Sequence, residues 1–340
     1  MLHACDAAPS RVYDTALLDL DGVVYAGGAA VPQAVEALAA ARADGMREAF
    51  VTNNASRTPE AVAEHLNRLG VPAGAEAVVT SAQAVARLVA EQLPPGARVL
   101  RVGGEGLRVA LEERGLHLVE SADDEPLAVV QGYGGPDLRW GLLAEASLAI
   151  GRGAAWFAAN ADATVPDARG IGPGNGAALE VVRIATRWMR PAPEPRVAGK
   201  PQPPMHRETI LRTGAQRPLV VGDRLDTDIE GARASGADSL LVLTGVTDAA
   251  QLVAAPVEHR PCYVAADLRG LLLPHPAPEK ADHGFACGGW RARCSGDSLV
   301  LNGDGDPLDG LRALCSAAWA AAGEGRCTAD AAEALSRLAR

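Results

Sequence analysis

Apolar and polar residues follow two different rhythms along this chain, and the two rhythms alternate. Short apolar runs at residues 15–20 and 49–52 predict β-strands. Residues 32–44 and 59–69 instead place apolar side chains three and four positions apart, which predicts helices that each open on a proline and stop at a glycine. Strand and helix in regular alternation predict a parallel sheet with helices on its faces.

A second region of the same kind lies between residues 82 and 190. Apolar runs predict strands at 98–102, 116–119, 128–131 and 155–158, and helical spacing predicts helices at 82–93 and 137–152. After a proline-rich stretch at 191–195 the first rhythm resumes, with predicted strands at 219–221 and 239–243. We therefore expect the middle region to be an insertion into the first domain.

The predicted fold class is α/β, with a parallel-sheet, Rossmann-like core, an inserted α/β domain and a small C-terminal α+β extension. We expect the core to comprise residues 1–81 and 193–274, the insertion 82–192 and the extension 275–340. A degenerate acetyltransferase-like fragment is one interpretation of the extension. Its apolar residues, Leu314 and Trp319 among them, are expected to dock onto the insertion or onto a second subunit.

Composition narrows the classes of function. The 340 residues are 48% hydrophobic, enough for two domains with their own cores. A dispersed net charge of −10 argues against a nucleic-acid partner but permits a small phosphorylated metabolite. Six cysteines lack zinc-site spacing, no apolar run reaches the ~18 residues of a membrane span, and the N-terminus lacks a signal-peptide core. We expect a cytoplasmic protein without a membrane partner, and a homodimer is left open.

The candidate chemistry begins with Asp19 and Asp21, which follow the first predicted strand. An isolated pair of this kind is usually a polar turn, so it needs support from elsewhere. Thr52, Asn53 and Asn54 follow the second strand, and ligands of parallel sheets bind at the carboxyl ends of the strands. Three further charged residues stand next to predicted strands or helices: Lys200, Asp223 and Asp228.

These residue types suit phosphoryl transfer, which depends on positioning and electrostatics. A carboxylate such as Asp19 can act as nucleophile and carry an aspartyl-phosphate. Because a carboxylate repels a phosphate dianion, a Mg²⁺ ion held by carboxylates is expected between them. Lys200 and the donors at 52–54 would hold the other phosphate oxygens, and Asp21 could move the proton.

The same residues form a set that resembles the motifs of the haloacid dehalogenase superfamily, in the subfamily with a large α/β cap. The motifs are Asp19-Leu20-Asp21-Gly22-Val23, Thr52-Asn53-Asn54, Gly199-Lys200-Pro201 and the stretch from Gly222-Asp223 to Asp228. The resemblance implies a phosphatase with Asp19 as nucleophile and Asp21 as general acid and base. It implies Mg²⁺ held by the Asp19 carboxylate, the Asp21 carbonyl and Asp223.

The resemblance also implies that Thr52, Asn53, Asn54 and Lys200 bind phosphate, with Asp228, or less well Asp226, in support. Residues 160–166 resemble the loop of the cap that selects substrate, which makes Asp162 a candidate contact. Glycerol 3-phosphate or phosphoglycolate is the favoured substrate. A nucleoside monophosphate or pyridoxal phosphate is an alternative, as is a non-hydrolytic role as a phospho-aspartate signalling module or a scaffold.

Overall fold

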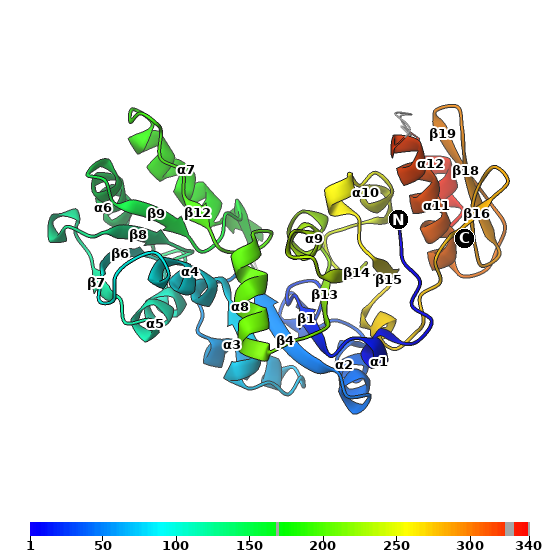
Figure 1. The fold of residues 1–340 in the computed structure, drawn as a ribbon, viewed down its shortest axis with the longest axis horizontal. Helices are drawn as coiled ribbons and strands as arrows, with labels where there is room; N and C mark the ends of the chain where they lie inside the picture. The colour runs from blue at the N-terminus through cyan, green and yellow to red at the C-terminus, as the bar shows by residue number, and fades with distance from the viewer. Residues whose placement is uncertain (168–169, 324–329, 339–340) are drawn as a thin grey trace. The chain divides into compact units, whose positions relative to one another are not determined.

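The computed structural model describes residues 1–167, 170–323 and 330–338 (Figure 1). The chain divides into two compact units. Unit 1 comprises Met1–Glu48 and Ala215–Arg340, and unit 2 comprises Ala49–Gly214. Unit 1 is thus built from two separate stretches of sequence, and unit 2 is inserted between them.

Unit 1 contains a parallel sheet in which β15, β14, β13 and β1 are neighbours in that order. These strands are β1 (Thr15–Leu18), β13 (Pro218–Gly222), β14 (Asp238–Val242) and β15 (Tyr263–Ala265). All four residues of β1 are buried, as expected for a strand of a parallel sheet that is covered on both faces. The helices joining the strands are α1 (Pro9–Val12), α2 (Ala34–Ala43), α9 (Glu230–Ser235) and α10 (Ala249–Val253), and a short hairpin of β2 (Tyr25–Ala26) and β3 (Ala29–Ala30) follows β1.

The C-terminal extension forms a second, antiparallel sheet within unit 1, covered by a long helix. Its elements are β16 (Glu279–Ala281), β17 (Gly284–Cys287), β18 (Trp290–Ser295), β19 (Ser298–Asn302), α11 (Pro307–Gly323) and α12 (Ala332–Ser336). Alternate strand residues such as Phe285, Leu299 and Leu301 are buried against α11. Figure 1 shows α11 between this sheet and α10.

The apolar face of α11 was expected to dock onto the insertion or onto a second subunit, but the structure places it elsewhere. Trp319 Nε1 donates a hydrogen bond to the Leu252 carbonyl (3.3 Å), and Arg312 Nη2 donates to the Val264 carbonyl (2.9 Å). Leu314 and Trp319 share a core with Leu252 and Val264. The extension therefore packs on α10 and β15 of its own unit, because these elements leave an apolar edge beside the parallel sheet.

Unit 2 contains a five-stranded parallel sheet in the order β12-β9-β8-β6-β7. Its strands are β6 (Arg98–Val102), β7 (His117–Val119), β8 (Ala128–Gln131), β9 (Ala155–Ala158) and β12 (Arg196–Val197). Figure 1 shows α6 (Trp140–Gly151) and α7 (Asn175–Thr186) on one face and α4 (Ser81–Ala90) and α5 (Glu105–Glu113) on the other. Leu100, Val129 and Trp156 pack against the α6–α7 face.

The rest of unit 2 comprises three smaller pieces. β4 (Arg47–Thr52) pairs in parallel with β5 (Val78–Thr80), α3 (Pro59–Arg68) lies between them in sequence, and β10 (Thr164–Asp167) pairs antiparallel with β11 (Gly170–Pro173). The third piece is α8 (Pro203–Thr213). Glu208 of α8 is fully buried and accepts hydrogen bonds from Arg87, Arg114 (3.1 Å) and Arg212 (2.6 Å), which ties α8 to α4 and to the end of α5.

The expected α/β class with parallel sheets is confirmed, and the antiparallel C-terminal sheet agrees with an α+β extension. Among the described residues, no helix combines the length and the apolar character needed to cross a bilayer.

Candidate functional site

The nucleophile candidate Asp19 lies directly after β1 and is held by the sheet itself. Its backbone N–H donates to the Val221 carbonyl of β13 at 2.8 Å, which continues the ladder between the two strands for one more residue. The side chain is half-buried. The end of a strand inside a parallel sheet thus fixes the backbone of Asp19, and it places this residue where the carboxyl ends of the strands meet.

A tight turn follows Asp19 and leaves Asp21 exposed to solvent. The Leu20 carbonyl accepts from Val24 N (2.9 Å) and Tyr25 N (3.1 Å), and Gly22 has a φ of +85°. This left-handed conformation is favourable for glycine and costly for a residue with a Cβ. Gly22 is therefore needed for the chain to turn at this point.

Asp19, Asp223 and Asp228 form a cluster in unit 1. One carboxylate oxygen from each lies within 4.8 Å of the others. Asp223 follows β13 and is 1% exposed, and Asp228 is also 1% exposed. The structure thus brings Asp19 together with two acids that lie more than 200 positions later in the sequence, as the motifs predict.

A neighbouring loop holds the Asp223 carboxylate in place. Val246 N donates to Asp223 Oδ2 at 2.7 Å, and Thr247 N donates to the Asp223 carbonyl at 3.1 Å. A Cβ built on Gly245 would lie 1.9 Å from Asp223 Oδ2, and one built on Gly22 would lie 2.5 Å from it. The carboxylate fills space that only these two glycines leave open.

The cluster has the donor set of a hard divalent cation. Three carboxylates at this separation repel one another, and two of them are removed from water, so a bound cation would stabilise the arrangement. Mg²⁺ favours oxygen ligands and is usually held by one or two carboxylates and several waters. The half-buried Asp19 leaves one side of the cluster within reach of water and substrate.

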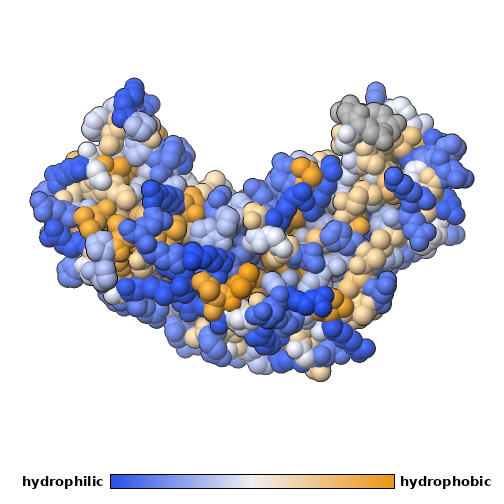
Figure 2. Space-filling model, in the orientation of Figure 1, coloured by the Kyte–Doolittle hydropathy of each residue, from blue (hydrophilic) through white to orange (hydrophobic). Residues whose placement is uncertain are grey.

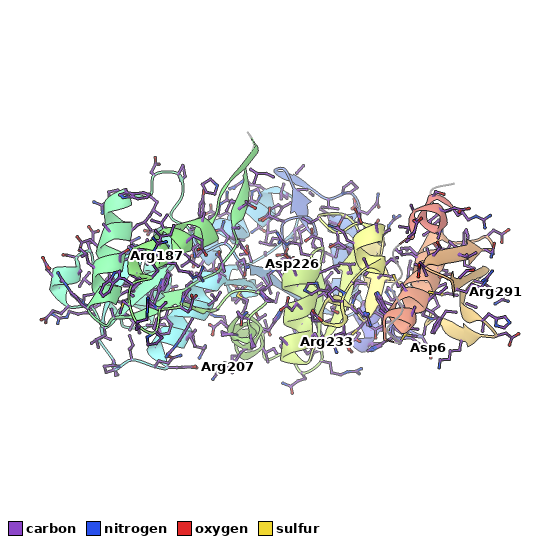
Figure 3. All side chains as sticks on the ribbon, turned by 90° about the horizontal axis from the view of Figure 1, so that it is seen from above. Asp6, Arg187, Arg207, Asp226, Arg233 and Arg291 are labelled. Carbon is purple, nitrogen blue, oxygen red and sulfur yellow. The ribbon has the colours of Figure 1, made fainter. Side chains whose placement is uncertain are left out.

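Asp226, the weaker candidate for a supporting role, does not belong to this cluster. It is exposed and accepts two hydrogen bonds from the Arg224 guanidinium, at 3.1 and 2.8 Å. Burial, the largest single influence, acts to raise the pKa of Asp226, but the hydrogen bond and the positive charge of Arg224, with smaller contributions, together lower the pKa. Figure 3 labels Asp226 in the segment that leads into α9. Asp228 instead lies against Gly222, where a Cβ would come within 2.2 Å of the Asp228 Cβ.

In unit 2, the side-chain amide of Asn53 forms two hydrogen bonds with the backbone of Lys200, a pair of contacts called the Asn53–Lys200 clasp below. Its Oδ1 accepts from Lys200 N (2.8 Å) and its Nδ2 donates to the Lys200 carbonyl (3.1 Å). Lys200 is 4% exposed, and its Nζ donates to the Val51 carbonyl at 3.3 Å. A Cβ on Gly199 would lie 2.7 Å from Asn53 Oδ1, so this clasp also depends on a glycine.

The residues beside Asn53 are also fixed by local hydrogen bonds. Thr52 is buried, and its Oγ1 accepts a hydrogen bond from Asn54 N at 3.1 Å, so the hydroxyl hydrogen is the donor that the side chain can offer. Asn54 Oδ1 accepts from Ser56 N and Ser56 Oγ, both at 2.9 Å. Its amide nitrogen is the part of the side chain suited to an anion.

Asp162 joins this group through Asn53. Asn53 Nδ2 donates to Asp162 Oδ1 at 3.2 Å, and Asn160 Nδ2 donates to the Asn53 carbonyl at 2.6 Å. Asn160 is 3% exposed and its own carbonyl accepts from Asn175 Nδ2 at 2.6 Å. Unit 2 thus brings Thr52, Asn53, Asn54, Lys200 and Asp162 together, as unit 1 does for the acids.

Three features of the sites were missed from the sequence. The contacts of Thr244–Thr247 with Gly22 and Asp223 could have been suspected, since Thr244-Gly245 follows a predicted strand. The Asn160–Asn175 contact had no sequence signal. His206 is fully buried near Lys200; burial lowers its pKa to about 3, and the Lys200 charge acts in the same direction.

An apolar pocket of about 570 Å³ lies elsewhere, between α6 and α7 of unit 2. Trp140, Leu148 and Trp188 line it, and all three are exposed. Figure 2 shows hydrophobic and hydrophilic residues side by side on the visible surface of this unit. The lining has no carboxylate or lysine, so this pocket lacks the groups needed for phosphoryl transfer.

Comparison with protein families gives three matches along the chain. The family described as haloacid dehalogenase-like hydrolase matches residues 16–117, and a family described as HAD-hydrolase-like matches residues 197–271. These two matches contain Asp19, Asp21, Thr52, Lys200 and Asp223. A family described as GCN5-related N-acetyltransferase-like matches residues 287–339, in the extension.

Individual relatives cover more of the chain. A D-glycerol 3-phosphate phosphatase of Mycobacterium tuberculosis is 46% identical over 92% of this chain and 87% of its own length. An acid sugar phosphatase of Staphylococcus aureus is 37% identical over 70% of this chain and 89% of its own length.

Solved structures that are similar to this chain also include phosphatases. The crystal structure of a glycerol phosphate phosphatase from M. tuberculosis in complex with magnesium has a TM-score of 0.87 and 44% identity, covering 98% of this chain and 99% of that one. A 4-nitrophenylphosphatase from Thermotoga maritima has a TM-score of 0.70 and 27% identity, covering 78% of this chain and 98% of that one.

Proposed function

Because the chain belongs to the haloacid dehalogenase-like hydrolases, we propose that it is a Mg²⁺-dependent phosphomonoesterase that acts through an aspartyl-phosphate. The observation that carries this proposal is the cluster of Asp19, Asp223 and Asp228, whose carboxylate oxygens lie within 4.8 Å of one another at the end of the central strands. A phosphatase needs a nucleophile next to a cation, and this cluster supplies both.

We propose that Asp19, Asp223 and the backbone carbonyl of Asp21 hold Mg²⁺, with Asp228 in support. When bound, Mg²⁺ would neutralise the repulsion between Asp19 and the phosphate dianion. The chain's own residues perform the transfer: an Asp19 oxygen attacks phosphorus as the bond to the ester oxygen breaks, and Asp21 protonates the departing alcohol. Asp21 then takes a proton from water, whose oxygen attacks phosphorus and frees Asp19. The exposed position of Asp21 suits a group that exchanges protons with water.

The phosphate-binding role belongs in this proposal to unit 2. We assign the transferring phosphoryl group to the Lys200 ammonium, the Thr52 hydroxyl and the donors of Asn53 and Asn54. Both hydrogens of the Asn53 amide are directed at Lys200 and Asp162, so Asn53 would contribute its backbone N–H and its grip on Lys200. Asp162 would contact the alcohol part of the substrate.

Glycerol 3-phosphate is the substrate we favour. The relative that acts on it matches 92% of this chain, and the glycerol phosphate phosphatase structure matches 98%, whereas the 4-nitrophenylphosphatase matches 78%. The first two matches therefore extend into the C-terminal extension. Phosphoglycolate, nucleoside monophosphates, pyridoxal phosphate and sugar phosphates are the alternatives within the same chemistry.

We further propose that the functional domains are a core of residues 1–81 and 193–274, a cap of residues 82–192 and the extension 275–340. A cytoplasmic location fits a metabolite substrate and the thiol state of Cys5, Cys262, Cys287 and Cys315. A homodimer is compatible with this function and is not required by it.

The test is phosphate release from a panel of phosphate esters, with and without Mg²⁺. We expect the highest kcat/KM for glycerol 3-phosphate, no turnover by Asp19→Asn, and near wild-type turnover by Asp226→Asn, a matched acid outside the cluster. Turnover by Asp19→Asn at the wild-type rate would refute the mechanism. A preference for another ester would change the substrate only, and a long-lived phosphoprotein would favour the signalling alternative.

A further inference from the structure

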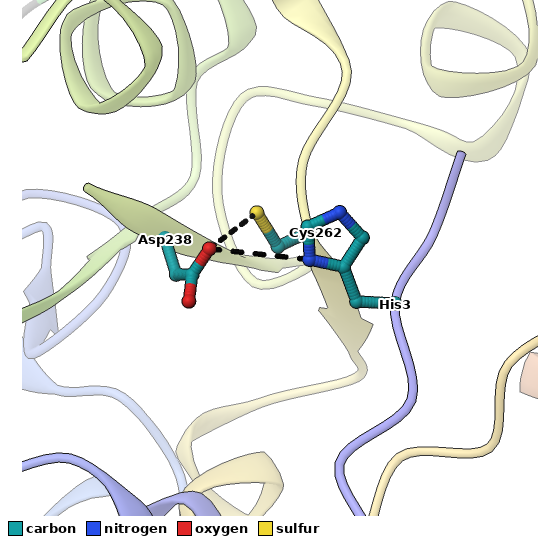
Figure 4. Close-up of side chains that lie close together, drawn as sticks. All are labelled: His3, Asp238 and Cys262. Carbon is teal, nitrogen blue, oxygen red and sulfur yellow. Dashed lines mark hydrogen bonds and ion pairs between the residues drawn. The ribbon is translucent and has the colours of Figure 1, made fainter. Parts of the chain in front are cut away.

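A second group of metal-type ligands lies in unit 1, away from the acid cluster. It consists of His3, Asp238 and Cys262, whose ligand atoms all lie within 4.8 Å of one another. His3 Nδ1 is 3.9 Å from Asp238 Oδ1, and Cys262 Sγ is 3.3 Å from the same oxygen. Figure 4 shows the three side chains meeting from three separate segments of the chain.

Each of the three residues is held by its backbone. Asp238 is the first residue of β14, and Cys262 immediately precedes β15. Cys262 N donates to Ser239 Oγ at 3.2 Å, and His3 N donates to the Cys262 carbonyl at 2.9 Å. A pair of hydrogen bonds between Cys5 and His275, at 2.8 and 2.9 Å, fixes the N-terminal segment on the other side of His3.

This group is on the opposite edge of the parallel sheet from the catalytic cluster. Asp238 and Cys262 stand at the amino ends of their strands, whereas Asp19 and Asp223 follow the carboxyl ends of β1 and β13. The five residues of β14 span roughly 16 Å at about 3.3 Å per residue. A cation bound at one edge would therefore not share ligands with a cation at the other.

We propose that His3, Asp238 and Cys262 form a binding site for a borderline-soft divalent cation of the zinc type. Imidazole nitrogen, carboxylate oxygen and thiolate sulfur are the ligands that Zn²⁺ takes, at about 2.0, 2.0 and 2.3 Å. A tetrahedral ion at those distances places its ligand atoms about 3.3–3.6 Å apart. Cys262 Sγ is already at such a distance from Asp238 Oδ1, whereas His3 Nδ1, 3.9 Å from that oxygen and within 4.8 Å of the sulfur, has to move closer.

The surroundings of the group support this assignment. Tyr13 Oη donates to Asp238 Oδ2 at 2.7 Å, so the oxygen that faces away from His3 and Cys262 is already oriented by a second residue. Carboxylates that bind a metal ion are usually held by such a hydrogen bond from a neighbouring residue. The His3 and Asp238 side chains are 53% and 42% exposed, so an ion and its water ligand can enter from solvent. The Cys262 thiol loses its proton to solvent when the ion binds.

The test is a titration of the full chain, without an N-terminal tag, with Co²⁺ as the spectroscopic substitute for Zn²⁺. Excess Mg²⁺ is added to compete for the acid cluster, which has no thiol. We expect thiolate-to-cobalt charge-transfer absorption that saturates at one equivalent of Co²⁺ and disappears when Zn²⁺ is added. Cys262→Ala is expected to abolish the absorption, and Tyr13→Phe to weaken binding about tenfold through the orientation of Asp238.

A matched cysteine provides the control. Cys287 Sγ donates to Asp309 Oδ1 at 3.4 Å, much as Cys262 does to Asp238, but no third ligand joins this pair in the part of the chain that the structure describes. Cys287→Ala is expected to keep the absorption. So is replacement by alanine of His283, an exposed histidine that belongs to neither group of possible ligands, whereas His3→Ala is expected to weaken binding. The absence of thiolate absorption in the folded wild-type protein, or its persistence in Cys262→Ala, would overturn the proposal.

Discussion

Replacing Gly245 by alanine tests whether the exact position of the Asp223 carboxylate, a proposed metal ligand, matters for activity. A Cβ at this position would lie 1.9 Å from Asp223 Oδ2 and 2.5 Å from its Cγ, closer than the 3.0 Å that real Cβ contacts keep. The backbone of Gly245 does not have a positive φ, so alanine brings no conformational strain there. The Asp223 carboxylate would have to retreat by about 1 Å, and the methyl group is the sole cause.

The size of the effect follows from what the carboxylate loses. Asp223 is 1% exposed, and its retreat would break the 2.7 Å hydrogen bond from Val246 N. Leaving buried groups unsatisfied in this way costs about 1–3 kcal/mol, or roughly a tenfold to a hundredfold loss of Mg²⁺ affinity. A displacement of about 1 Å in a catalytic constellation can also lower kcat/KM by about 100-fold.

The assay is phosphate release as a function of Mg²⁺ concentration, together with the melting temperature by circular dichroism. Gly141→Ala is the control, because a Cβ there meets nothing within 4 Å and alanine suits the helix. We expect Gly245→Ala to need at least tenfold more Mg²⁺ and Gly141→Ala to behave as wild type. A folded Gly245→Ala protein with Mg²⁺ dependence and kcat/KM within about twofold of wild type would refute the reasoning on Asp223.

Three further outcomes follow from burial and hydrogen bonding. Trp319→Ala is expected to lower the free energy of unfolding by about 3–5 kcal/mol, because Trp319 is 3% exposed, whereas Trp188→Ala, 67% exposed, should leave it nearly unchanged in denaturant titrations. Burial holds the pKa of His206 near 3, so the folded protein keeps this side chain neutral while the unfolded chain takes up a proton below about pH 6.5. The free energy of unfolding therefore falls as the pH drops toward 4, by up to about 1.4 kcal/mol per pH unit. His206→Gln should flatten this slope in unfolding experiments at different pH, and an unchanged slope would contradict the assignment. Asn53→Ala is expected to lower kcat/KM about tenfold or more by releasing the backbone of Lys200, and kinetics equal to wild type would show that the clasp is dispensable.

Strand positions in this chain could be predicted closely where apolar runs are short and well bounded. The strands expected at 98–102, 128–131 and 155–158 have the same bounds in the structure. Helix α7 was missed, because the glycines at 170–176 that precede and open it indicate a turn rather than a helix start. The five-residue strand β14 begins one residue earlier than expected, which is within the usual uncertainty of element ends.

The acids of the cluster could be predicted from the sequence, whereas the residues that hold them in place could not. Asp19 and Asp223 follow strands of a parallel sheet, and topology alone brings such positions to one edge. The contacts of Val246 with Asp223, and of Asn160 with Asn53, depend on where loops fold back in three dimensions. Neither spacing nor residue type encodes such contacts, so the sequence points to the reacting groups more clearly than to the residues that position them.

The central claim is that Asp19 itself becomes phosphorylated. Rapid quenching of Asp21→Asn with 4-nitrophenyl phosphate tests it most directly, because this ester's leaving group needs no proton while removal of the base slows hydrolysis of the intermediate. Mass spectrometry of the quenched protein is expected to find one phosphoryl group, carried on Asp19. Release of phosphate with no phosphoryl group on Asp19 at any time point, or with the label on another residue, would contradict the account.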